Sequence, residues 1–241
     1  MNRTSPPAPP TLPTPPAPPI IVAIDGPAGV GKSTVARRLA KRLRVPYVDT
    51  GAMYRATALY LASRGVDPDD RLAVAESLQA MPLRLLLVDG GAQVELDGRA
   101  PGEGLRRPEV GALTSRIAVH PEVRRRMVAL QQEFLQRHGG VMEGRDIGTV
   151  VVPQTPFKFY LDAAPQVRAD RRHAELLAKG SISDPGEVAH QLADRDARDS
   201  SRSESPLQPA PGACHIDTGT LRPDEVVEKM LAEIRSRSTQ G

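Results

Sequence analysis

The fold is decided by the stretch IIVAIDGPAGVGKST, residues 20–34. Its first five residues form a short apolar run, which is typical of a fully buried parallel strand. Residues 26–33, GPAGVGKS, then match the pattern G-x-x-x-x-G-K-[ST] in full. The following ten residues, VARRLAKRLR, place apolar side chains at helical spacing. A strand, a glycine loop and a helix in this order predict an α/β fold.

The glycine loop predicts a site for a nucleoside triphosphate with Mg²⁺. Glycines allow successive backbone N–H groups to converge on phosphate oxygens, and the start of the next helix adds its dipole. Lys32 would bridge the β- and γ-phosphates, and the Ser33 hydroxyl would ligate Mg²⁺. The residues expected to bind the nucleotide here are Gly26, Pro27, Ala28, Gly29, Val30, Gly31, Lys32, Ser33 and Thr34. The alternative is a glycine-rich turn that contains Lys-Ser by chance, and the order of elements argues against it.

The rest of the chain alternates strand and helix patterns with one interruption. Strands are expected at PYVDTG, VMEG, FKFYLDA and ACHIDT, and helices over 52–65, 66–80, 122–138, 165–179, 185–202 and from about Pro223. Residues 83–98 instead predict two strands about an Asp89-Gly90-Gly91 turn, a hairpin inserted outside the main sheet. We therefore expect a parallel sheet flanked by helices, with an inserted lobe and with ligands at the carboxyl ends of the strands.

Composition indicates the domain content, the cellular compartment and the classes of partner to expect. The chain has 241 residues, enough for one domain with an insertion, and residues 1–19 form a proline-rich tail that we expect to be disordered. The tail would act as a spacer or as a ligand for a proline-recognising domain. A single cysteine favours the reducing cytoplasm, and we expect no membrane span and no secretory signal. Scarce aromatics and a net charge of only +3 argue against nucleic-acid binding, and the five dispersed histidines against a metal cage.

Arginines point to a small anionic substrate. They recur near predicted strand ends and in the late helices, at Arg55, Arg145, Arg168, Arg171, Arg172, Arg195, Arg198 and Arg202. In RDARDSSR, three of them fall at i, i+3 and i+7 and would share one helix face, where a phosphate cluster would relieve their repulsion. Asp196 and Asp199 are the alternative source of that relief. Because neither an NKxD motif nor a clear Walker B acid pair is found, a small-molecule kinase is favoured over a GTPase or an ATPase machine.

The motifs IDGPAGVGKST, VDTGAMYRA, GRDIGTVV and RDARDSSR, in this order and spacing, closely resemble bacterial cytidylate kinases. The resemblance covers residue 20 to the C-terminal helix. It implies transfer of the ATP γ-phosphoryl group to CMP or dCMP with Mg²⁺. It also implies a core of about 20–65 and 113–241, a monophosphate-binding insert of about 66–112 and a mobile lid of about 162–184. A monomer is our default expectation.

The resemblance also assigns roles to residues. Lys32, Arg145, Arg195 and Arg202 would be catalytic, and the lid arginines Arg171 and Arg172 would lie near the ATP phosphates, with Arg168 close by. The CMP site would comprise Thr50, Gly51, Tyr54, Arg55, Ser115, Arg124, Arg145, Asp146, Arg195, Asp199 and Arg202. Within this set Arg55 and Arg145 would contact the acceptor phosphate, Asp146 the cytosine and Asp199 the sugar hydroxyl.

Two chemical considerations agree with that resemblance. A CMP phosphate is already an anion, so its phosphorylation needs charge neutralisation more than a general base. A carboxylate accepts a hydrogen bond from the cytosine amine but repels uracil O4, so Asp146 with Arg124 suits cytosine. The adjacent Arg145 and Asp146 would then contact two ends of one nucleotide, the alternative being a surface ion pair. A kinase acting on a metabolite hydroxyl and an ATP-binding regulatory module remain as rival functions.

Overall fold

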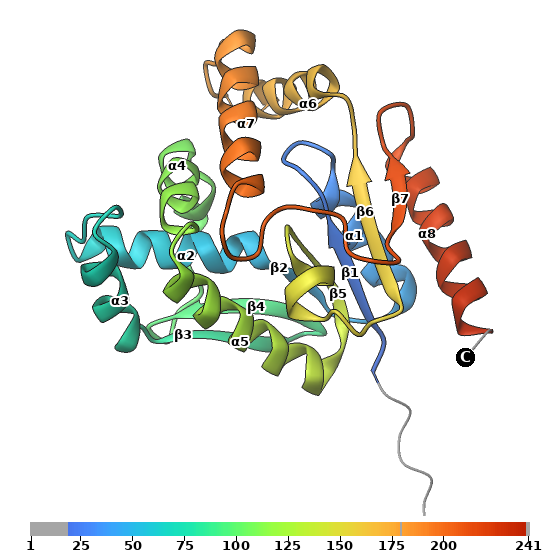
Figure 1. The fold of residues 1–241 in the computed structure, drawn as a ribbon, viewed down its shortest axis with the longest axis horizontal. Coiled ribbons are helices and arrows are strands. Elements are labelled where there is room, and N and C mark those ends of the chain that lie inside the picture. The colour runs from blue at the N-terminus through green and yellow to red at the C-terminus, as the bar shows by residue number, and fades with distance from the viewer. Residues whose placement is uncertain (1–18, 179, 240–241) are drawn as a thin grey trace, which may run out of the picture.

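The computed structural model describes residues 19–178 and 180–239. The proline-rich tail predicted over 1–19 lies, apart from Pro19, outside the described residues, as does Lys179, the predicted end of a helix. A five-stranded sheet with the order β2-β5-β1-β6-β7 forms the centre of the protein, and all of its pairings are parallel (Figure 1). The predicted α/β fold class is therefore confirmed.

The elements of the main sheet and of the insert have the following bounds. The strands are β1 (Ile21–Asp25), β2 (Tyr47–Asp49), β3 (Leu83–Val88), β4 (Gly91–Leu96), β5 (Gly140–Gly144), β6 (Phe157–Asp162) and β7 (Cys214–Asp217). The α-helices are α1 (Lys32–Leu43), α2 (Thr50–Ser63), α3 (Arg71–Gln79), α4 (Pro108–Ile117), α5 (Pro121–His138), α6 (Pro165–Ala178), α7 (Pro185–Ser200) and α8 (Pro223–Ser238). A 3₁₀ turn, η1 (Glu103–Arg106), and a π-helical turn, η2 (Ile147–Val151), complete the set.

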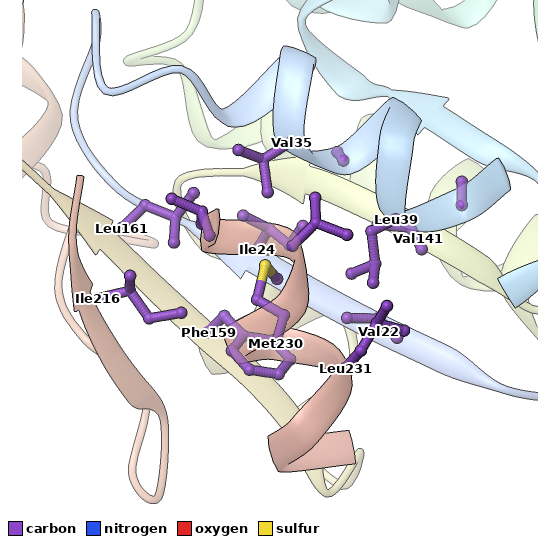
Figure 2. Packing of buried hydrophobic residues seen from close by; sticks show 14 of the residues in the cluster. Val22, Ile24, Val35, Leu39, Val141, Phe159, Leu161, Ile216, Met230 and Leu231 are labelled. Atoms are coloured by element: carbon purple, nitrogen blue, oxygen red, sulfur yellow. The ribbon is translucent and has the colours of Figure 1, made fainter. Parts of the chain in front are cut away.

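Helices cover both faces of the main sheet, as its apolar strands require. Side chains of β1 alternate between the two faces, so Val22 and Ile24 pack with α1 and α8 while Ala23 packs toward α5. Figure 2 shows Val22 and Ile24 gathered with Leu39 of α1 and Met230 of α8 in one apolar cluster. The strands are thus fixed from both sides, which holds their carboxyl ends rigidly in place. Helices α6 and α7 stand beyond those ends (Figure 1).

The inserted hairpin is confirmed as a separate two-stranded antiparallel sheet. Asp89 and Gly90 both have positive φ, 50° and 76°, so the turn contains two residues and Gly91 already begins β4. The hairpin and α3 share an apolar cluster with α2 and α5. The core of the lobe therefore draws on both sides of the predicted insert, and the boundaries near 65 and 113 stay predictions.

Local structure departs from expectation in a few places. The helix predicted over 66–80 covers only Arg71–Gln79, because the side chain of Asp70 caps it by accepting from the N–H groups of Leu72 and Ala73 at 3.0 and 3.1 Å. Sequence patterns did not predict α4, η1 or η2. The segment IGTVV in η2 is β-branched and follows a strand, yet Val152 N–H bonds Ile147 O at 2.8 Å across a π-type turn. In the described part of the chain, no helix combines the length and apolarity that a membrane crossing requires.

Candidate active site

The phosphate loop opens into a cavity of about 740 Å³ at the carboxyl ends of the central strands. This size is in the range of small-molecule sites. All of the predicted site residues line the cavity except Gly26, Pro27 and Arg168. The loop after β1 and residues from α1, α2, α4, α5, β5, α6 and α7 are thereby brought together, as the topology of a parallel sheet leads one to expect.

The loop between β1 and α1 has the backbone that a phosphate site needs. Gly26 has a φ of 148°, and a Cβ there would lie 2.1 Å from Leu161 O, so no other residue fits. Gly26 and Pro27 contribute carbonyls, which accept from Lys32 Nζ at 2.8 and 2.6 Å. Burial, and then the nearby Arg145, hold the pKa of Lys32 well below its usual range. The two hydrogen bonds to loop carbonyls thus hold the Lys32 ammonium group against the loop.

A cluster of three arginines surrounds one carboxylate on the opposite side of the cavity. Asp199 is 1% exposed; its Oδ2 accepts from Arg145 Nε at 2.8 Å and lies 3.8 Å from Arg195 Nε, while its Oδ1 contacts Arg202. Burial and the neighbouring Arg145 lower the pKa of Arg195 to about 10. One carboxylate cannot neutralise three guanidiniums, so the cluster keeps an excess of positive charge.

Four arginines around the cavity have a side-chain donor without a hydrogen-bond partner within the part of the chain that the structure describes. The Nε atoms of Arg55, Arg124, Arg195 and Arg202 are buried and have no hydrogen-bond partner among the described residues. Buried donors are nearly always paired in native proteins, and leaving one unpaired costs about 1–3 kcal/mol. These Nε atoms have almost no accessible surface, so a polyanionic ligand such as a nucleotide phosphate would pair with them only after the side chains shift.

The neighbours Arg145 and Asp146 do not pair with each other, so the alternative of a surface ion pair is wrong. Asp146 is 5% exposed and its Oδ2 accepts from Arg124 at 2.5 Å, whereas Arg145 turns to Asp199. The Arg124 guanidinium carbon lies 5.8 Å from the centre of the Tyr54 ring. Asp146, Arg124 and Tyr54 thus form one wall of the cavity and the arginine cluster another.

The predicted face of three guanidiniums on one helix is wrong. Helix α7 ends at Ser200, so Arg202 lies beyond it, and Arg198 donates through Nε to Ser115 Oγ at 3.1 Å in place of joining the cluster. The cluster instead combines Arg195 and Arg202 with Arg145, which directly follows β5 and is distant along the chain. Asp199 relieves part of their repulsion, which is the alternative that the sequence left open.

The lid arginines behave differently from one another. Arg171 lines the cavity and donates to Thr218 O and Gly219 O at 2.7 and 3.2 Å, and Arg172 lines it while pairing with Glu175 at 2.9 Å. Their contacts with ATP stay predictions. Arg168, also expected near the ATP phosphates, lines a second cavity of about 450 Å³ beside the loop.

Three acidic residues that line the cavity were not predicted, namely Asp49, Glu143 and Glu175. Glu143 is the last residue but one of β5, is 6% exposed, and accepts from Tyr47 OH at 2.7 Å. Asp49 ends β2, caps α2 by accepting from Ala52 N–H at 3.0 Å, and pairs with Arg55 at 3.4 Å. A single acid after the short buried run VM was the available signal for Glu143, but it lacks the neighbouring second acid that a Walker B pair would show. Among the described residues, no group of three His, Cys, Asp or Glu side chains could hold a metal by itself.

A phosphate loop that faces an arginine cluster across one cavity defines a P-loop phosphotransferase of the kind that brings two polyanions together. Comparison with known proteins narrows this class. The family model of cytidylate kinase matches residues 22–236, so the chain belongs to the cytidylate kinase family.

Curated relatives agree with this assignment. A cytidylate kinase of Solibacter usitatus is 45% identical over 92% of this chain and 95% of its own length. A cytidylate kinase of Syntrophotalea carbinolica is 43% identical over 90% and 93%. A solved structure of an uncharacterized protein from Eubacterium ventriosum superposes with a TM-score of 0.51 at 14% identity, covering 90% of this chain and 98% of that one, and shows the same fold.

Proposed function

We propose that the protein transfers the γ-phosphoryl group of ATP to the phosphate of CMP or dCMP. The observation that carries this proposal is the cavity itself, which has a complete phosphate loop on one side and three arginines around Asp199 on the other. A phosphate oxygen of CMP attacks the γ-phosphorus, the bond to the β,γ-bridging oxygen breaks, and ADP leaves with that electron pair. Nucleoside diphosphates are the products on both sides.

The residues divide this work between donor and acceptor. The loop N–H groups and Lys32 hold the β- and γ-phosphates of ATP, and Arg171 and Arg172 lie over that end of the cavity. Arg55, Arg145, Arg195 and Arg202 hold the acceptor phosphate and spread the charge that develops during transfer. Because the attacking oxygen is already ionised, a general base is not required.

The base is bound by the wall of the cavity that contains Asp146 and Arg124, and the sugar by Asp199. The Asp146 carboxylate accepts from the cytosine amine while Arg124 fixes it in place, and Ser115, held by Arg198, lies nearby. Asp199 is also proposed to contact the sugar hydroxyl. Its oxygens already contact arginines, so this contact would use the remaining lone pairs.

The cavity suits Mg²⁺ bound together with ATP. Ser33 offers a hydroxyl and Glu143 a buried carboxylate beside the loop, and hard oxygen donors of this kind are the ones Mg²⁺ accepts along with phosphate oxygens. When bound, the ion would neutralise charge on the transferring phosphates. We further propose a location in the cytoplasm, which the single cysteine in 241 residues supports, with a monomer as the default oligomeric state.

A coupled ADP-release assay with a panel of acceptors tests the proposal. CMP and dCMP are expected to stimulate ADP release strongly, with UMP weaker and shikimate or sugars inert. Phosphorylation of a hydroxyl acceptor with CMP and dCMP inert would establish the rival kinase reading. Slow ATP hydrolysis that no acceptor stimulates would instead indicate a regulatory module.

A further inference from the structure

One residue of the phosphate loop has both of its backbone polar groups bound by an ion pair from α6 and α7. The N–H of Ala28 donates to Asp196 Oδ1 at 3.2 Å, and the carbonyl of Ala28 accepts from Arg168 Nη1 at 3.2 Å. The same Nη1 of Arg168 contacts Asp196 Oδ2, which closes a ring of three groups. The two peptide groups that flank the Ala28 Cα are therefore fixed by Asp196 of α7 and Arg168 of α6.

Arg168 is itself rigidly placed. Its side chain is buried, and its Nε donates to Ala163 O at 3.1 Å at the start of α6. Gly29, the next residue of the loop, has a φ of 82°, and a Cβ there would lie 2.9 Å from both Arg168 Cβ and Arg168 O. The loop thus packs directly against α6 as well as bonding to it, and the two cannot shift independently.

Asp196 lies in α7 between residues of the acceptor cluster, but its own side chain contacts the phosphate loop on the donor side. Its sequence neighbour Arg195 and Asp199, three residues further along, belong to the acceptor cluster, whereas Asp196 itself reaches the donor loop. A helix rises only about 1.5 Å per residue, so the three side chains lie within little more than one turn of a rigid element. A movement of α7 that carries Arg195 toward an acceptor phosphate therefore also moves the carboxylate that holds Ala28.

We propose that Asp196, together with Arg168, is a positioning residue that couples the phosphate loop to the acceptor arginines. Binding of ATP to the loop then sets α7 in the place where Arg195 and Asp199 receive CMP, and binding of CMP favours the loop conformation that receives ATP. Such coupling is reciprocal by thermodynamic necessity. This inference rests on the proposed function, because it concerns the same two nucleotides.

The test measures binding of a non-hydrolysable ATP analogue and of CMP by calorimetry, each alone and in the presence of the other. The variants are Asp196→Ala, Arg168→Met and the double variant, with Asp194→Ala as control. Asp194 lies on the same helix, is half exposed, and pairs with His190 on the outer surface. Because Arg168 is left unpaired in Asp196→Ala, Asp196→Asn is included as a variant that keeps an acceptor for Ala28 N–H.

We expect Asp196→Ala to weaken binding of the ATP analogue about tenfold and to change binding of CMP alone less than about twofold. The coupling factor, by which each nucleotide increases the affinity for the other, should fall toward a value of one. Asp196→Asn should fall between this variant and the wild type. The double variant should be no weaker than the more affected single variant, because both residues act on the backbone of Ala28. Asp194→Ala should change none of these values.

Three outcomes would overturn the inference. The first is a coupling factor of one in the wild type. The second is an Asp196→Ala variant that folds and keeps the wild-type coupling factor. The third is an equal loss of affinity for both nucleotides with no change in the coupling factor. Melting temperatures of all variants separate a folding defect from these outcomes. Failure of the proposed function is distinguished by the wild type alone, which would then release no additional ADP when CMP is added.

Discussion

Replacement of Asp146 by Asn tests whether this buried carboxylate selects the base. Asn keeps the size of the side chain, and its Oδ1 can still accept from Arg124, so the wall of the cavity is preserved. Asp146→Ala is a poorer choice, because it would remove the hydrogen-bond acceptor of the buried Arg124 as well as its anion, at a cost of about 3–5 kcal/mol in stability. The Asn variant therefore isolates the loss of negative charge facing the base.

The size of the effect follows from the burial of the pair. The side chains of Arg124 and Asp146 are only 4% and 8% exposed, so a base that contacts them does so largely shielded from water. A well-placed contact of this kind discriminates between bases by about 1–3 kcal/mol, which corresponds to roughly 5- to 150-fold in rate constant ratios. We expect kcat/KM for CMP to fall by about that factor. The value for UMP should change little or rise, because the Asn amide can donate to uracil O4.

The assay is initial-rate ADP release with CMP and UMP under the same conditions, accompanied by thermal melting of the wild type and the variant. The informative quantity is the ratio of the two kcat/KM values, since a general loss of active enzyme cancels from it. Equal losses for CMP and UMP with an unchanged melting temperature would refute the role of Asp146 in base selection.

Three further predictions concern the loop, its supporting acid and the lid. Lys32→Met should lower kcat about 100- to 1000-fold while calorimetric CMP binding stays within about twofold, and an equal loss of CMP binding would contradict the donor-side role. Burial raises the pKa of Asp25 to about 6 even though it accepts from the N–H groups of Ile147 and Gly148. Since the pKa of Asp25 in the unfolded chain is near 3.8, its contribution to the free energy of unfolding is full below about pH 4 and declines by about 3 kcal/mol as pH rises through 6. The difference in the free energy of urea unfolding between the wild type and Asp25→Asn should therefore shift by this amount between about pH 4 and pH 7. A difference that stays constant over this range would disprove the prediction. Hydrogen exchange in residues 162–184 should slow when ATP analogue and CMP are both bound, and unchanged exchange would remove the case for a closing lid.

The sequence predicted the parts of the fold that depend on contiguous residues. The strand, loop and helix around Lys32 are consecutive, and the strands leading to Glu143 and Asp162 are short apolar runs, so local patterns suffice to place them. The hairpin followed from its Asp-Gly turn. Family membership, inferred from four motifs, is confirmed by the match over residues 22–236.

The partners of the arginines could not be predicted in the same way. Helical spacing grouped Arg195, Arg198 and Arg202, but spacing does not say what each side chain meets across the cavity. Arg198 meets Ser115 of α4, an element that the sequence patterns did not predict, and Arg145 reaches the cluster from the residue that follows β5. The partners of Arg168 could not be predicted for a related reason, because Ala28 and Asp196 lie 140 and 28 residues away along the chain.

The excess positive charge around Asp199 has a consequence for the lifetime of the protein. Guanidiniums held together in a buried cluster repel one another and weaken the folded state, and an anionic substrate that binds only that state removes the strain by mass action. Molecules without nucleotide should therefore open more often and be cleaved by proteases sooner than molecules that carry it. The abundance of the enzyme would then rise and fall with the pool of its own substrates, without any dedicated regulator.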